Sequence, residues 1–136
     1  MSDLAVSPVV AGRAAADGVV WLLRLEGVAA LAAATAGYAF VGGSWLLFAA
    51  LLLAPDLAML GYLAGPRVGA AVYNAAHVYI APAALGAVGL ALAAPTLPPL
   101  ALIWVAHIGL DRALGYGLKS ATGFSDTHLG RIGRGA

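Results

Sequence analysis

The sequence predicts an all-α integral membrane protein, an up-down bundle of four transmembrane helices with both termini in the cytoplasm. Of its 136 residues, 62% are hydrophobic and 10% are charged, and the mean hydropathy is +0.94. A soluble domain usually carries about 25% charged residues, so much of this surface must face lipid. No charged residue occurs from Val68 through Leu110. That stretch is longer than the ~20 apolar residues needed for one crossing.

Four spans are expected within a single membrane domain of residues 1–136, at residues 18–41, 44–64, 68–93 and 97–118. Glycine and proline mark the links between them, which are Gly42-Gly43, Gly65-Pro66-Arg67 and Ala94-Pro95-Thr96. Links this short make sequential helices antiparallel, which favours the up-down bundle. Residues 119–136 are expected to form a polar, glycine-rich tail.

Basic residues predict the orientation. Arg13 precedes the first span, Arg67 lies in the second link, and three basic residues follow the last span, namely Lys119, Arg131 and Arg134. The first and third links contain no lysine or arginine. By the positive-inside rule, both termini and the second link face the cytoplasm, and the expected location is the cell inner membrane.

Charge and cysteine content exclude several function classes. The net charge of +1 comes with no basic stripe, which argues against nucleic-acid binding. Because the chain has no cysteine, it cannot form a disulfide, a thiolate nucleophile or a cysteine-ligated zinc site. The partners that remain are the lipid bilayer and further copies of the chain.

Ionisable side chains inside the predicted spans are the main functional signal. They are Glu26, Asp56, His77, His107 and Asp111. Charged groups at such depth cost about 3 kcal/mol each on insertion scales and usually mark a function. Counted from the cytoplasmic end of each helix, all five lie roughly 11–17 Å deep. The spacing therefore predicts one layer of ionisable groups shared by four helices.

This layer has the composition of a divalent-metal site, with zinc favoured. His107 and Asp111 stand at i and i+4 on one helix face, where an imidazole and a carboxylate can hold one ion. Asp56, which follows the helix-kinking Pro55, and His77 complete the predicted ligand set. Tyr73 and Asn74, one turn before His77, are expected to orient its ring. Glu26 is expected to act as general base or fifth ligand.

Simpler interpretations stay open beside this one. Asp111 can pair with Arg112 or Arg24, and Asp56 can cap a helix at the proline kink. An intramembrane histidine is often a hydrogen-bonding residue that joins helices. The whole layer can also be an ion-pair network that fixes helix register.

Four strings carry a resemblance to a known family: Ala54–Tyr62 (APDLAMLGY), Tyr73–Tyr79 (YNAAHVY), Ala106–Gly117 (AHIGLDRALGYG) and Phe124–Gly130 (FSDTHLG). Together they resemble the small bacterial membrane proteins of domain-of-unknown-function family 4260. The resemblance runs from about Leu25 to Ile132. It implies a four-helix membrane protein and brings no assigned activity.

A looser resemblance concerns chemistry. Pro55-Asp56, His77 and His107-x-x-x-Asp111 occur in the order seen in LexA-regulated membrane-bound metal-dependent hydrolases. The chain departs from them at Asn74-Ala75-Ala76-His77, where those hydrolases have His-Arg-x-x-Thr-His. The resemblance implies hydrolysis of an ester or phosphoester of an amphipathic substrate, by water that a bound metal brings toward a pKa of ~7.

Other functions fit the same residues. A small transporter or proton-relay subunit would use the acids and imidazoles to carry protons. His77 and His107 could serve as axial ligands of a haem, and a purely structural subunit needs no chemistry. For the hydrolase, Asp126 and His128 in the tail are candidates for a lid or an extra ligand.

Overall fold

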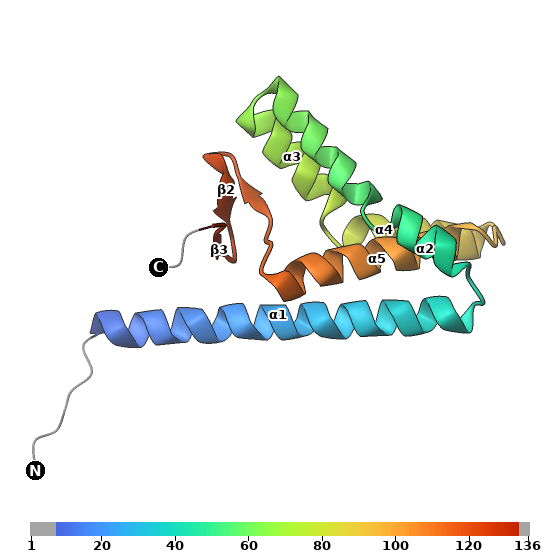
Figure 1. Ribbon diagram of the computed structural model, residues 1–136, viewed down its shortest axis with the longest axis horizontal. Helices are drawn as coiled ribbons and strands as arrows, with labels where there is room; N and C mark the ends of the chain where they lie inside the picture. Colours follow the sequence, from blue (N-terminus) through green and yellow to red (C-terminus); the bar gives the residue numbers. More distant parts are fainter. Residues whose placement is uncertain (1–7, 134–136) are drawn as a thin grey trace, which may run out of the picture.

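The computed structural model describes residues 8–133, which are mostly helical (Figure 1). A long first helix is followed by a series of shorter ones: α1 (Pro8–Phe40), α2 (Trp45–Leu51), the 3₁₀ helix η1 (Ala54–Ala64), α3 (Pro66–Ala76), α4 (Ile80–Ala91) and α5 (Leu97–Leu114). Three short strands end the described chain, namely β1 (Lys119–Ser120), β2 (Gly123–Thr127) and β3 (Gly130–Arg131).

Several of these helices are suited to cross a membrane. Three stretches are long and apolar enough: Ala15–Phe40, Trp45–Ala64 and Leu97–Leu114. Helices α3 and α4 make a fourth if the pair, bent by 42°, is counted as one span. Large apolar side chains on these stretches are exposed, for example Leu22, Leu46 and Leu63 at 62%, 82% and 88%. Such surfaces are expected where a helix faces lipid rather than water.

The two middle spans differ from the continuous helices that the sequence predicts. The span predicted for residues 44–64 stops being α-helical after Leu51 and resumes as the 3₁₀ helix η1. Pro55, near the start of η1, has no N–H to donate, which explains a break at this point. The span predicted for residues 68–93 is interrupted between α3 and α4.

The outer spans differ mainly at their ends. Helix α1 begins at Pro8, ten residues before the predicted 18, because the alanine-rich segment that contains Arg13 and Asp17 continues the same helix. Helix α5 ends at Leu114 instead of 118. Gly115 follows with φ 93, a left-handed conformation that ends a helix and that glycine adopts without strain.

Helices α1 and α5 form the most extensively packed pair and run antiparallel, with α4 also packed on α5 (Figure 1). Their backbones touch at two glycines. A Cβ placed on Gly27 would lie 2.8 Å from the carbonyl oxygen of Gly109, and one on Gly109 would lie 2.6 Å from the amide nitrogen of Leu31. Small residues at this crossing let the helices approach closely, as is common in membranes.

The second packing unit is a hairpin of η1 and α3, which slants away from the α1–α5 pair in Figure 1. Residues 119–131 form the antiparallel sheet β1-β2-β3, with Lys119 paired to Thr127 and Asp126 to Arg131. This sheet packs against α3 where the sequence predicts only a tail. The side chain of Asn74 joins them, since it donates to the carbonyl of Lys119 at 2.8 Å and accepts from its N–H at 2.7 Å.

Candidate metal centre

The four residues predicted as metal ligands come together at the junction of the two packing units. Asp56 stands at the start of η1, His77 follows the last residue of α3, and His107 and Asp111 lie one turn apart on α5. One potential ligand atom from each lies within 4.8 Å of all the others. Asp56 and His77 therefore lie next to the two helix breaks, and His107 and Asp111 lie on the uninterrupted helix α5.

The distances within this group match a metal-sized cage. The Nε2 atoms of His77 and His107 are 3.0 Å apart. Oδ1 of Asp56 lies 3.4 and 3.5 Å from these two nitrogens, and Oδ2 of Asp111 lies 3.4 and 3.6 Å from them. A tetrahedral ion with bonds of 2.0–2.1 Å sets its ligand atoms about 3.3 Å apart. The group therefore has the dimensions to hold one metal ion.

The ring of His77 is held so that Nε2 is free to bind a metal. Its Nδ1 lies 2.8 Å from the carbonyl oxygen of Tyr73, which can only accept, so the proton must be on Nδ1. Tyr73 also stacks on the ring of His77, with centroids 3.7 Å apart, and its hydroxyl donates to Oδ2 of Asp111 at 3.2 Å. Such outer contacts fix the tautomer and orientation of metal-binding residues. The Nδ1 atom of His107 is buried without a partner among the described residues.

One side of the group is closed and the other is open. Both histidines are fully buried, and the side chain of Asp111 is 12% exposed, while that of Asp56 is 32% exposed. A cavity of about 300 Å³ borders the two carboxylates and extends to Tyr116 and Lys119. The group thus has an access route on its carboxylate side.

Two side chains from α5 support the break between α3 and α4, and this role is not predicted from the sequence for either. Arg112 donates to the carbonyl of His77 at 2.8 Å, and Trp104 donates to the carbonyl of Ala76 at 2.7 Å. Arg112 also donates to the carbonyl of Tyr116 at 2.8 Å. Carbonyls freed by a helix break in a membrane need such partners. The sequence of α5 does not predict these two roles, because Ala76 and His77, whose carbonyls accept the bonds, are distant in sequence.

Three interpretations of the sequence do not match these contacts: an ion pair of Asp111 with an arginine, the orientation of His77 by Asn74, and a bis-histidine haem. Neither Arg24 nor Arg112 forms an ion pair with Asp111 in the described chain; Arg24 donates to the carbonyl of Ala113 at 2.9 Å. Asn74 does not orient His77, because both its hydrogen bonds go to Lys119. A bis-histidine haem would place the two nitrogens on opposite sides of the iron, about 4 Å apart for two metal–nitrogen bonds of about 2 Å. The observed 3.0 Å argues against that alternative.

Glu26 is not brought into the group. Its side chain is exposed and borders a separate small cavity of about 120 Å³, together with Tyr79, Arg112 and His128. Its assignment as general base or fifth ligand stays a prediction.

The tail covers the cavity, but not through the two residues that the sequence suggested. Asp126 accepts from Thr122 at 2.8 Å and pairs with Arg131 at 3.6 Å, while Nδ1 of His128 accepts from the N–H of Leu118 at 2.8 Å. The tail residues that line the cavity are Phe124, Ile132 and Lys119, the last of which is 5% exposed. Burial lowers the pKa of Lys119, and the nearby Asp111 and Asp56 partly oppose that shift.

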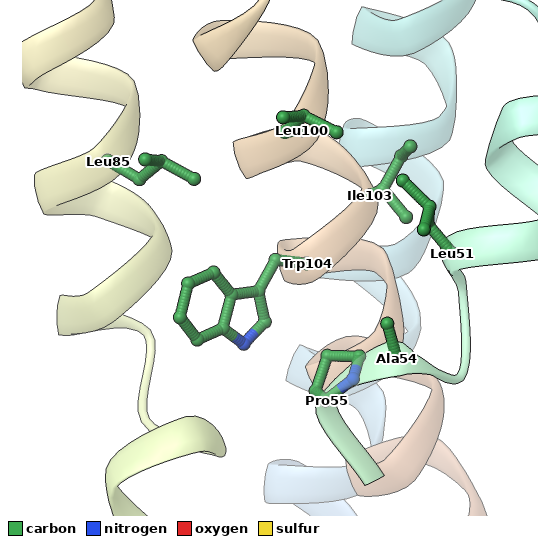
Figure 2. Close-up of a pocket in the computed structure, with 7 residues that line it drawn as sticks. All are labelled: Leu51, Ala54, Pro55, Leu85, Leu100, Ile103 and Trp104. Atoms are coloured by element: carbon green, nitrogen blue, oxygen red, sulfur yellow. The ribbon is translucent and has the colours of Figure 1, made fainter. Parts of the chain in front are cut away.

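A second cavity, of about 260 Å³, lies on the other side of Pro55. Figure 2 shows Trp104 and Leu100 of α5 facing this space, with Leu85 of α4 opposite and Pro55 below. Its walls are apolar, and the indole N–H of Trp104 is already bonded to Ala76. The cavity offers room for an apolar group and no chemistry of its own.

Comparisons with known proteins agree with the resemblance seen in the sequence. No curated protein and no solved structure matches the chain. One family model matches, over residues 20–132, and it includes all four residues of the group. Since this match covers most of the sequence, the chain belongs to the family described as a domain of unknown function (DUF4260).

Proposed function

We propose that this protein is a divalent-metal-dependent hydrolase of the cell inner membrane that acts on an amphipathic or lipid substrate. Asp56, His77, His107 and Asp111 are the proposed ligands, and zinc is the favoured ion. The observation that carries the proposal is the set of nitrogen–oxygen distances of 3.4–3.6 Å around two imidazoles whose Nε2 atoms are 3.0 Å apart. Two imidazoles and two carboxylates are a ligand set that zinc accepts.

The chemistry would take place on the carboxylate side of the group. A catalytic metal lowers the pKa of its bound water toward ~7, which supplies a nucleophile for ester or phosphoester cleavage at neutral pH. Asp56, which is partly exposed to the cavity, can exchange contact with the ion for contact with water. Tyr73 holds Asp111 through its hydroxyl, and the stacked rings of Tyr73 and His77 limit motion on the closed side.

The test is metal content by mass spectrometry, on protein purified in mild detergent without a histidine tag. We expect about one zinc, manganese or iron ion per chain in the wild type and a loss of that ion in Asp56→Ala/His107→Ala. The matched control is Asp126→Ala/His128→Ala, which removes the same residue types outside the group and should keep the metal.

The metal content distinguishes the hydrolase from a proton-relay or transport role. Metal that disappears only in the first double variant justifies screening lipid esters and phosphoesters as substrates. No metal in the wild type, even after divalent ions are added back, would refute the hydrolase and leave a proton-relay or transport role. Four ionisable groups joined by hydrogen bonds and ion-pair contacts at one junction would also suit that alternative.

We further propose that the chain crosses the bilayer four times in an up-down arrangement, with both termini in the cytoplasm. The proposal counts α2 with η1 and α3 with α4 as one bent crossing each, and it rests on the basic residues Arg13, Arg67 and Arg131. Because the chain has no cysteine, single cysteines placed near Gly12, Gly42, Gly65 and Gly123 are unique reporters. An impermeant thiol reagent added outside intact cells should label only the one near Gly42.

A further inference from the structure

The cavity beside the candidate metal centre contains a lysine that the proposed hydrolysis does not yet use. Lys119 is 5% exposed, and its side chain borders the cavity together with Asp56, Asp111, Tyr73 and Tyr116. Its Nζ lies 3.8 Å from the ring centroid of Phe124 and 5.0 Å from that of Tyr73. Among residues 8–133 it has no ion-pair partner. Aromatic rings hold this ammonium over the cavity, and no carboxylate of the described residues is close enough to form an ion pair with it.

The position of Lys119 is set by its backbone and not by its charge. Asn74 exchanges two hydrogen bonds with the main chain of Lys119, at 2.7 and 2.8 Å, which docks β1 on α3. The side chain could therefore change without releasing the strand. Buried lysines are seldom retained without a partner.

Counting charges shows what kind of partner is missing. The two carboxylates of Asp56 and Asp111 balance a divalent ion, so the ammonium of Lys119 is left as an excess positive charge. The guanidinium of Arg112, which bonds to the carbonyl of His77, is also positive, and its hydrogen bonds within residues 8–133 go to carbonyls. Such an excess of positive charge favours the binding of an anion. The apolar part of the wall, formed by Met59, Phe124 and Ile132, suits a ligand whose remaining portion is apolar.

We propose that the cavity binds the phosphate group of the substrate between the metal ion and the ammonium of Lys119. This inference rests on the proposed function and names its substrate class, a phosphate ester. Phosphate chemistry fits because its oxygens can contact a metal and an ammonium at the same time. The phosphate could belong to a lipid headgroup or to a soluble molecule.

The test compares phosphate binding in zinc-supplemented wild type, Lys119→Met and Lys119→Arg. The matched control is Arg131→Met, which removes an exposed cation (side chain 68% exposed) from the same sheet. Inorganic phosphate is one probe. The other is phosphatidic acid in phosphatidylcholine nanodiscs, scored against nanodiscs of phosphatidylcholine alone. Metal content is measured on every sample.

We expect Lys119→Met to keep its metal and bind the probe at least tenfold more weakly, since one charge-assisted contact is lost. Lys119→Arg and Arg131→Met should stay within a few-fold of the wild type. Binding of both probes supports phosphate recognition in general, and binding of the nanodisc probe alone assigns the lipid source. Unchanged affinity in Lys119→Met, or no binding of either probe by metal-containing wild type, overturns the inference while the metal site stands. Absence of metal in the wild type instead refutes the proposed function.

Discussion

Replacing Arg112 by methionine tests whether the broken span depends on a single side chain. Arg112 is 8% exposed and donates to two carbonyls, those of His77 and Tyr116, each at 2.8 Å. A hydrogen bond from a charged donor contributes about 1.5–3 kcal/mol, so two bonds contribute about 3–6 kcal/mol. Removing a buried charge also relieves its desolvation cost, which offsets part of the loss. We expect the free energy of unfolding to fall by about 3 kcal/mol.

The assay is unfolding of the protein in mixed micelles by increasing SDS, followed by tryptophan fluorescence. Arg24→Met is the matched control, because Arg24 makes one hydrogen bond among the described residues, to the carbonyl of Ala113 at 2.9 Å, and should lose about half as much stability, about 1.5 kcal/mol. Arg112→Lys keeps the charge but not the two-armed geometry, so its stability should lie in between. Equal unfolding of Arg112→Met and Arg24→Met would refute the view that the guanidinium holds the break.

Two further predictions concern the helix crossing and the tail sheet. In Gly27→Ala the new Cβ would lie 2.7 Å from the backbone nitrogen of Ala113, so α1 must move and the cost should be about 1–3 kcal/mol. Gly37→Ala, whose Cβ would lie 3.4 Å from a flexible Leu102 side chain, is the control in the same SDS titration, and equal costs would contradict the close crossing. His128 accepts the N–H of Leu118, and burial and Arg112 lower its pKa below the usual 6.5. The stability it gives the sheet is therefore fully present above pH 6.5 and is lost as the pH falls through the folded-state value. Hydrogen exchange at Leu118, corrected for its intrinsic rate, should accelerate over that range in the wild type, and His128→Gln should remove the pH dependence.

Much of the arrangement of the candidate site could be predicted, because depth in a membrane helix is linear in sequence. Counting residues from each helix end placed Asp56, His77, His107 and Asp111 at one level, and the structure brings these four side chains together. Glu26 had a similar depth but faces another direction on α1. Depth alone does not state which way a side chain points, and the i and i+4 rule applies only within one helix.

The helix breaks and the tail were harder to predict, since their causes are not local. Pro55 predicts a kink, but no residue near His77 predicts that α3 ends at Ala76. That break is held by Arg112 and Trp104 from a helix some thirty residues away. The strands β1 and β3 have two residues each, too few to show an alternating pattern. The contact of Gly27 with Gly109 likewise cannot be predicted until α1 and α5 are known to be neighbours.

The place of the four-residue group between two packing units has a consequence for biogenesis. The η1–α3 hairpin packs on itself and on the sheet, whereas α5 packs on α1 and α4. Asp56 and His77 come from the first unit or its end, and His107 and Asp111 come from the second. A nascent chain therefore has only half of the candidate ligands until α5 has been made. If the group binds a metal as proposed, the ion would join the hairpin to the α1–α5 pair only after α5 is in place.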